Sequence, residues 1–170
     1  MRLTDGEASD IAHYLLRETR VPAALELAVY RGNLRSLDDI DGAELARTGP
    51  ADGFALDAAA RNRDARRFSG WLRVDDGGTY TFYFTASGAA RLAVDGQWIA
   101  GQDSWERETV DAKIVRHLDA GWHAVKVDYL HRGIKPAALK LEWEGPGVTR
   151  ALVPASRLRS EREAASDPVD

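Results

Sequence analysis

The fold is decided by residues 68–96, which read FSGWLRVDDGGTYTFYFTASGAARLAVDG. In the middle of this stretch, Tyr80–Phe84 alternates with a period of two, so that three aromatic rings share one face and the other face is more polar. Aromatic and β-branched residues at this period are typical of a half-buried strand. The glycine-containing segments 75–78 and 95–96 favour hairpin turns, because glycine accepts a positive φ at little cost. The stretch therefore predicts three consecutive antiparallel strands.

The composition limits the classes of protein to be considered. The chain has 170 residues, of which 44% are hydrophobic and 29% charged, enough for one globular domain with a real core. The formal net charge of -4 argues against a nucleic-acid partner, which needs a basic face. The chain has no cysteine, which excludes disulfides, thiolate zinc sites and cysteine nucleophiles. No apolar run approaches the roughly 20 residues of a membrane span, and this segment carries no signal peptide.

The same alternation recurs along the rest of the chain. Further strands are expected in 24–30, 121–129 and 139–144, while 31–53 and 101–112 are expected to be irregular. Many short strands spaced about 8–12 residues apart indicate a sandwich or barrel and not βαβ units. We therefore expect an all-β, two-sheet antiparallel sandwich.

An amphipathic helix is expected to precede the sandwich. Thr4 and Glu7 form a capping box, apolar residues follow at helical spacing, and Pro22 ends the helix. Residues 160–170 are acidic and almost free of apolar side chains, which predicts a disordered, solvated tail. The expected organisation is a helix at 1–20, the sandwich at 21–159 and the tail at 160–170.

Four segments together resemble a known family. These are residues 68–96, HLDAGWHAVKVDYL at 117–130, ALKLEWEGPG at 138–147 and LVPASRL at 152–158. In this order they resemble the PA14 domain, the jelly-roll-type β-sandwich named after anthrax protective antigen, over residues 24–158. The resemblance implies a non-catalytic module, often joined to glycosidases, proteases, adhesins or toxins. In its yeast adhesin members, the domain binds sugar through a calcium ion held partly by two adjacent aspartates.

The calcium-binding loop of the family is altered in this chain. Ser87 and Gly88 stand where the resemblance implies the aspartate pair, and Arg91 follows. Calcium needs several hard oxygen ligands, and a serine and a glycine supply no negative charge. The site is expected to be degenerate, so we expect no metal and no cofactor.

The N-terminal sequence LTDGEASDIAHYLLRE resembles the last helix of a c-type cytochrome domain, although no haem-attachment motif is present. An ordinary capped helix packing on the sandwich explains it equally well. Together the two resemblances imply a piece of a longer exported protein, located in the periplasm, at the cell surface or outside the cell. The expected partners are glycans or surface polysaccharide and other domains of the parent protein, among them a c-type cytochrome.

No catalytic motif is visible, and the histidines have no metal-ligand spacing. His123 is expected to be a hydrogen-bonded core residue, and the acids at 38–41 and 75–76 are expected to be loop and turn acids. Trp98 and Trp105 flank a polar segment, the mix of an aromatic and polar groups that sugar sites use, although capping the core is the more ordinary role for Trp98. The expected ligand-binding residues are Ser87, Arg91, Gln97, Trp98, Asp103, Trp105, His131 and Arg132.

The sequence thus predicts a non-catalytic carbohydrate-binding or recognition module, with its site at one end of the sandwich. Two alternatives remain open at this stage. One is a structural spacer or protein-interaction domain without glycan affinity, and the other is a glycoside-processing enzyme.

Overall fold

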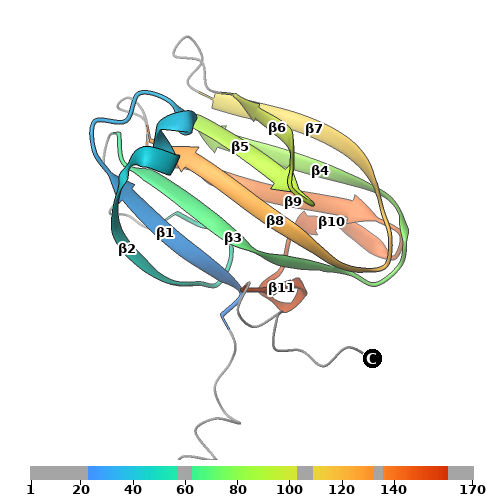
Figure 1. The fold of residues 1–170 in the computed structure, drawn as a ribbon. Coiled ribbons are helices and arrows are strands. Elements are labelled where there is room, and N and C mark those ends of the chain that lie inside the picture. Colours follow the sequence, from blue (N-terminus) through green and yellow to red (C-terminus); the bar gives the residue numbers. More distant parts are fainter. Residues whose placement is uncertain (1–22, 57–62, 103–108, 132–135, 161–170) are drawn as a thin grey trace, which may run out of the picture.

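The computed structural model describes residues 23–56, 63–102, 109–131 and 136–160. Within them the chain forms a sandwich of two antiparallel β-sheets, together with two short 3-10 helices (Figure 1). This confirms the predicted fold class. The expected N-terminal helix and the tail from residue 161 lie outside the described residues.

The larger sheet has seven strands and forms the front layer in Figure 1. Its strand order is β2-β1-β3-β8-β5-β6, with β11 paired to β3. The strands are β1 (Leu25–Arg31), β2 (Glu44–Ala51), β3 (Ala65–Val74), β5 (Ala89–Val94), β6 (Gln97–Gln102), β8 (Gly121–Leu130) and β11 (Leu158–Arg159).

The smaller sheet has four strands in the order β10-β9-β4-β7 and lies behind the first. Its central strand β4 pairs along its whole length with β7 and also with β9. The strands are β4 (Gly78–Ser87), β7 (Thr109–Leu118), β9 (Leu139–Gly145) and β10 (Val148–Leu152).

The chain crosses between the sheets more often than the sequence suggested. The prediction of a hairpin at 75–78 is wrong, because β3 belongs to the larger sheet and β4 to the smaller one, so this turn is a corner between layers. At Gly88, which has a φ of 91°, the chain passes from β4 in the smaller sheet back to β5 in the larger sheet. The hairpin at Asp95-Gly96 is confirmed, since it joins the paired strands β5 and β6 with positive φ at both residues.

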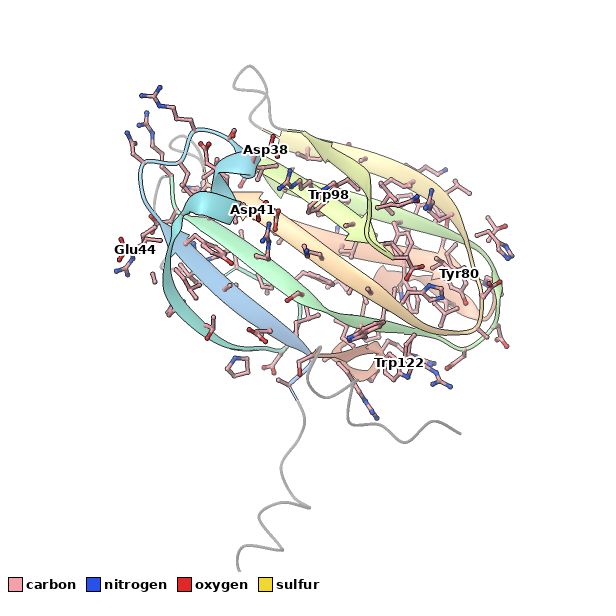
Figure 2. The ribbon with its side chains drawn as sticks, viewed as in Figure 1. Asp38, Asp41, Glu44, Tyr80, Trp98 and Trp122 are labelled. Atoms are coloured by element: carbon pink, nitrogen blue, oxygen red, sulfur yellow. The ribbon has the colours of Figure 1, made fainter. Side chains whose placement is uncertain are left out.

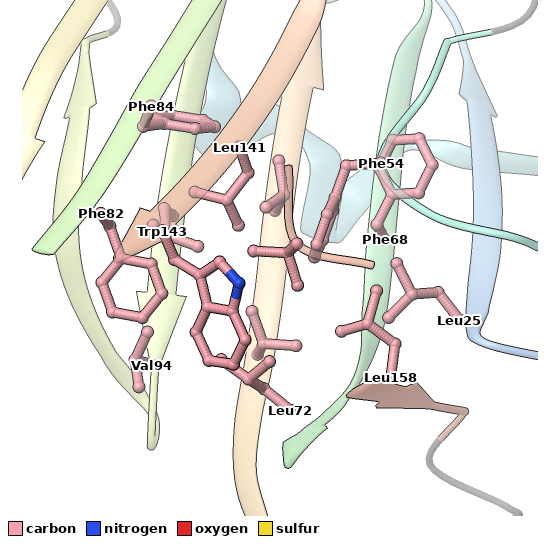
Figure 3. Close-up of a cluster of buried hydrophobic side chains, with 14 of the residues drawn as sticks. Leu25, Phe54, Phe68, Leu72, Phe82, Phe84, Val94, Leu141, Trp143 and Leu158 are labelled. Atoms are coloured by element: carbon pink, nitrogen blue, oxygen red, sulfur yellow. The ribbon is translucent and has the colours of Figure 1, made fainter. Parts of the chain in front are cut away.

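Aromatic side chains from both sheets fill the core (Figure 3). The three rings that alternate along β4 are buried as predicted, with exposures of 1% or less. Tyr80 stacks on Trp143 with centroids 5.5 Å apart, and Phe54 meets Phe68 edge to face at 5.9 Å. Burying each such side chain stabilises the fold by about 1.5–3 kcal/mol. Gly145 is required beside the stack, because a Cβ there would lie 2.4 Å from the Tyr80 ring.

Residues 31–53 are more regular than expected. They contain the 3-10 helix η1 (Leu37–Gly42) and the edge strand β2. Nearly every side chain of β2 is exposed, and its sequence shows no alternation of apolar residues that would predict a strand. The strand is recognised by its backbone pairing with β1. The irregular segment expected at 101–112 is also shorter, because β6 continues to Gln102 and β7 begins at Thr109.

Candidate functional site

One end of the sandwich carries a hollow of about 770 Å³. It lies where β4 ends and where β7 and β9 begin. Strand register places Thr85 beside Asp111 on one side and beside Lys140 on the other. These three polar side chains lie in the lining together with apolar groups such as Leu56 and Leu139. A hydroxyl, a carboxylate and an ammonium group in one row can donate and accept hydrogen bonds to a polar ligand.

Ser87 lies at the edge of this hollow, and its hydroxyl is fully engaged within the protein. Its Oγ donates to the carbonyl oxygen of Pro136 at 2.9 Å and accepts from the backbone N–H of Ala138 at 2.8 Å. A further bond joins the Ser87 N–H to the Ala138 carbonyl. These hydrogen bonds join the segment before β9 to the end of β4. Ser87 is only 7% exposed, so it presents little surface to a ligand.

His131 belongs to the same buried network. Its Nδ1 lies 2.9 Å from the Tyr129 hydroxyl, which is itself 3.3 Å from Ser87 Oγ. Burial, together with the charge of nearby Arg66, lowers the pKa of His131, so the ring is neutral near pH 7 and Nδ1 can accept the tyrosine proton. His131 is 7% exposed, and through the Tyr129 hydroxyl it is linked to Ser87 at the edge of the hollow.

Arg91 points away from this end, onto the outer face of the larger sheet. Its Nε lies 3.0 Å from Oδ2 of Asp128, a carboxylate with no exposed surface, and its Nη1 lies 2.8 Å from Asp38 of η1. Arg67 approaches Asp128 from the other side at 2.7 Å and also binds Asp41. The two arginines thus neutralise a buried charge and hold η1 against the sheet.

Trp98 also lies on that outer face, as Figure 2 shows beside Asp38 and Asp41. It is 45% exposed, so the prediction that it caps the core is wrong. The Arg91 guanidinium lies over its ring, 4.1 Å from the centroid. Gln97 precedes it at the start of β6 and accepts a hydrogen bond from Arg116 at 2.9 Å. Because β6 begins at the Asp95-Gly96 hairpin, both residues lie far along the strand from the hollow.

Asp103, Trp105 and Arg132 lie outside the described residues, so their place relative to the hollow stays a prediction. The structure adds Thr85, Asp111 and Lys140, which the sequence analysis had not singled out. Thr85 and Lys140 lie at outward positions of predicted strands, whereas Asp111 lies in the segment expected to be irregular. The pairing that brings the three together cannot be read from the sequence.

The described residues offer no group of three or more His, Asp or Glu side chains able to hold a metal ion. At the position of the family's aspartate pair, the Ser87 hydroxyl is used by the protein itself, so the donor set does not fit calcium. The acids of η1 are also engaged, Asp38 and Asp41 by arginines and Asp39 by the backbone N–H groups of Arg35 and Ser36. Those two backbone hydrogen bonds lower the pKa of Asp39.

His123 is hydrogen-bonded, as predicted, but at the end of the strand and not in the core. Its Nδ1 lies 2.7 Å from the Asp95 carboxylate, and its Nε2 lies 2.7 Å from the Asp119 carbonyl oxygen. The ring therefore joins the β5–β6 hairpin to the β7–β8 turn. Burial acts to lower its pKa, but the two hydrogen bonds outweigh burial and raise it.

The two antiparallel sheets, with a chain that crosses repeatedly between them, define a β-sandwich of the jelly-roll type. The sequence profile of the PA14 domain matches residues 30–157, and the chain belongs to the PA14 domain family. No curated protein sequence matches the chain significantly.

Solved structures share the fold at low sequence identity. A PA14 sugar-binding domain from an RTX adhesin has a TM-score of 0.66 at 17% identity, covering 82% of this chain and 99% of that one. The Epithelial Adhesin 6 A domain from Candida glabrata, solved with Galβ1-3GlcNAc, has a TM-score of 0.63 at 13% identity and coverages of 84% and 89%. An anti-sigma factor domain-containing protein from Clostridium clariflavum has a TM-score of 0.67 at 23% identity, covering 82% of this chain and 48% of that chain. The chain thus spans about half the length of that protein.

Across the described residues, no helix has the length and apolar character needed to cross a bilayer.

Proposed function

We propose that this domain is a non-catalytic carbohydrate-binding module that recognises its ligand without calcium, at the end of the sandwich formed by β4, β7 and β9. The observation that carries the proposal is the hollow itself, in which Thr85, Asp111 and Lys140 form a polar row beside apolar groups. Sugars present hydroxyls beside apolar C–H faces, and this mixture of wall types matches them.

Family membership and the fold shared with sugar-binding adhesin domains support this proposal. The metal-free mode is supported by Ser87, whose hydroxyl already has its partners within the protein. Hydroxyl recognition would then rest on Asp111, which accepts, and on Lys140, which donates. Lys140 also forms an ion pair with Glu142 at 2.5 Å, which restrains its amino group next to the hollow.

The predicted residues Asp103, Trp105 and Arg132 remain candidate ligand contacts in this proposal. The module would act in the periplasm, at the cell surface or outside the cell, within a longer exported chain. Its partners would be glycans or surface polysaccharide and other domains of that chain, a c-type cytochrome being the candidate that the N-terminal sequence suggests.

A glycan array, probed in millimolar calcium and again in excess chelator, tests the proposal. We expect binding of at least one glycan in both conditions, and weaker binding by Asp111→Ala and Lys140→Ala. Lys113→Ala is the matched control, since Lys113 is an exposed lysine on the outer face of the same sheet but outside the hollow.

Two results would count against the proposal. Absence of binding to any glycan at millimolar concentration would support a structural spacer or protein-interaction domain instead. Binding that disappears with chelator would show that a calcium site exists after all.

A further inference from the structure

A second hollow lies on the outer face of the larger sheet, on the opposite layer from the first. It measures about 390 Å³, within the roughly 300–1,000 Å³ of small-ligand pockets. Trp98 on β6 forms one wall of this hollow and Arg67 on β3 lies on the opposite side. The small side chains of Ser69 and Ala93 line the floor between them. Lys126 rises between them, because strand register places it between Ala93 and Ser69.

The tryptophan in this wall is held in place before any ligand arrives. Arg91 stacks on its ring at 4.1 Å, and Arg91 is itself fixed by the buried Asp128 at 3.0 Å and by Asp38 at 2.8 Å. Trp98 nevertheless keeps 45% of its surface exposed. An exposed aromatic ring that is already held in place offers a stacking surface, because preorganisation lowers the entropy lost when a ligand binds to it.

The hollow also has a positive electrostatic character. Its lining includes Arg67 and Lys126 and no carboxylate. The charge of Arg67 is matched by Asp128 and Asp41, whereas exposed Lys126 pairs with no carboxylate in the described parts of the chain. The nearest acidic position is Asp128, two residues further along the same face of β8, and its carboxylate is already bound by Arg67 and Arg91. The ammonium group of Lys126 is thus available to an anionic ligand.

We propose that this face binds an acidic saccharide, with a uronate ring stacked on Trp98 and its carboxylate paired with Lys126. The apolar C–H face of a pyranose fits against an indole, and Ser69 lies within the same hollow to bond a ring hydroxyl. This site is separate from the hollow at the end of the sandwich, and it does not rest on the function proposed there.

Calorimetric titration tests the proposal, with oligosaccharides of galacturonate, mannuronate and glucuronate as probes and their methyl esters as uncharged counterparts. We expect at least one acidic probe to bind and its methyl ester to bind more weakly. Trp98→Ala should weaken binding by about tenfold or more, the scale of one lost aromatic contact of about 1.4 kcal/mol. Lys126→Ala should remove the preference for the acid over the ester. Trp98→Leu, which keeps an apolar side chain but removes the ring, should also weaken binding and covers the case in which Trp98→Ala fails to fold.

Tyr83→Ala is the matched control, because Tyr83 lies on the outer face of the other sheet and also stacks with an arginine, Arg150 at 3.7 Å. It should bind the acidic probe as the unmodified domain does, and so should Asp111→Ala at the end hollow. The proposal is overturned if none of the acidic probes binds at millimolar concentration, if Trp98→Leu and Trp98→Ala bind as tightly as the unmodified domain, or if acid and ester bind equally.

Discussion

Ser87 shows how one residue can change the use of a loop. Its hydroxyl joins β4 to the 136–138 segment through Pro136 and Ala138, and it touches the hydroxyl of Tyr129. An aspartate at this position would bring a charge into a site that is 7% exposed and already satisfied. The position that the family resemblance assigns to metal binding thus holds the end of the sandwich together in this chain.

Replacing Ser87 with alanine should destabilise the domain. The change removes the acceptor of the Ala138 N–H and the donor to Pro136, and leaving such groups unpaired costs about 1–3 kcal/mol. Urea unfolding followed by fluorescence measures the loss. Ser156→Ala, at an exposed position, is the control and should change stability by no more than about 0.5 kcal/mol. Equal losses for the two variants would contradict the structural role of Ser87.

The two histidines with shifted pKa values should respond oppositely to pH. His123 has its pKa raised above 6.5, so its contribution to stability is present below the unfolded pKa and is lost as pH rises through the folded value. The pKa of His131 is lowered in the folded state. As pH falls below 6.5, the imidazole of His131 takes up a proton more readily in the unfolded chain, so the domain loses stability. Titration of the imidazole signals by NMR, assigned with His123→Gln and His131→Gln, measures both. A higher pKa for His131 than for His123 would contradict the described hydrogen bonds.

At the scale of elements, η1 is held to the sheet by charges as well as by apolar contacts. Leu37 and Ile40 pack on the sheet, while Asp128 lies beneath, bound to Arg67 and Arg91. The hydrogen bonds to Asp128 outweigh desolvation and raise the pKa of Arg67. A short 3-10 helix has little stability of its own, so its position depends on the apolar contacts and the ion network together.

Removing the buried charge should therefore loosen this element. Asp128→Asn leaves two arginines without their shared carboxylate, and breaking a buried ion pair from one side costs about 3–5 kcal/mol. Asp38→Asn removes an aspartate whose side chain is 86% exposed, and such pairs contribute at most about 1 kcal/mol. Denaturant unfolding of both variants, with hydrogen exchange at 37–42, measures the effect. Similar stabilities for the two would show that the buried charge is not what anchors η1.

The strand faces could be predicted from the sequence, whereas the assignment of strands to sheets could not. The alternation of apolar and polar residues predicts that Tyr80 and Val125 point into the core, because burial of one strand face imposes a period of two. The turn at 75–78 has the same chemistry as a hairpin, although it joins two layers. The end hollow depends on the pairing of Thr85 with residues 26 and 55 positions later, Asp111 and Lys140, and no local pattern encodes that pairing.

At the scale of the whole molecule, the end hollow and the hollow beside Trp98 lie on different layers of the sandwich. One is formed by β4, β7 and β9, and the other by β3, β5, β6 and β8. The aromatic core between them is continuous and forms the rigid support of both (Figure 3). Variants in one hollow are far from the other in the strand network, so their effects on binding should add independently.

The stability of the whole domain should not depend on calcium. An ion that binds only the folded state raises the free energy of unfolding by RT ln(1 + [L]/Kd), about 2.7 kcal/mol at a hundredfold excess over Kd. The described residues hold no cluster of three metal-binding side chains, and Ser87 stands where an aspartate would be needed. We therefore expect the same melting temperature, within about 1 °C, in millimolar calcium and in excess chelator, since a shift of about 2–4 °C would accompany each 1 kcal/mol in a domain of this size. Differential scanning calorimetry measures this, and magnesium at the same ionic strength controls for screening. A calcium-specific rise in melting temperature would show that a metal site is formed with residues beyond those described.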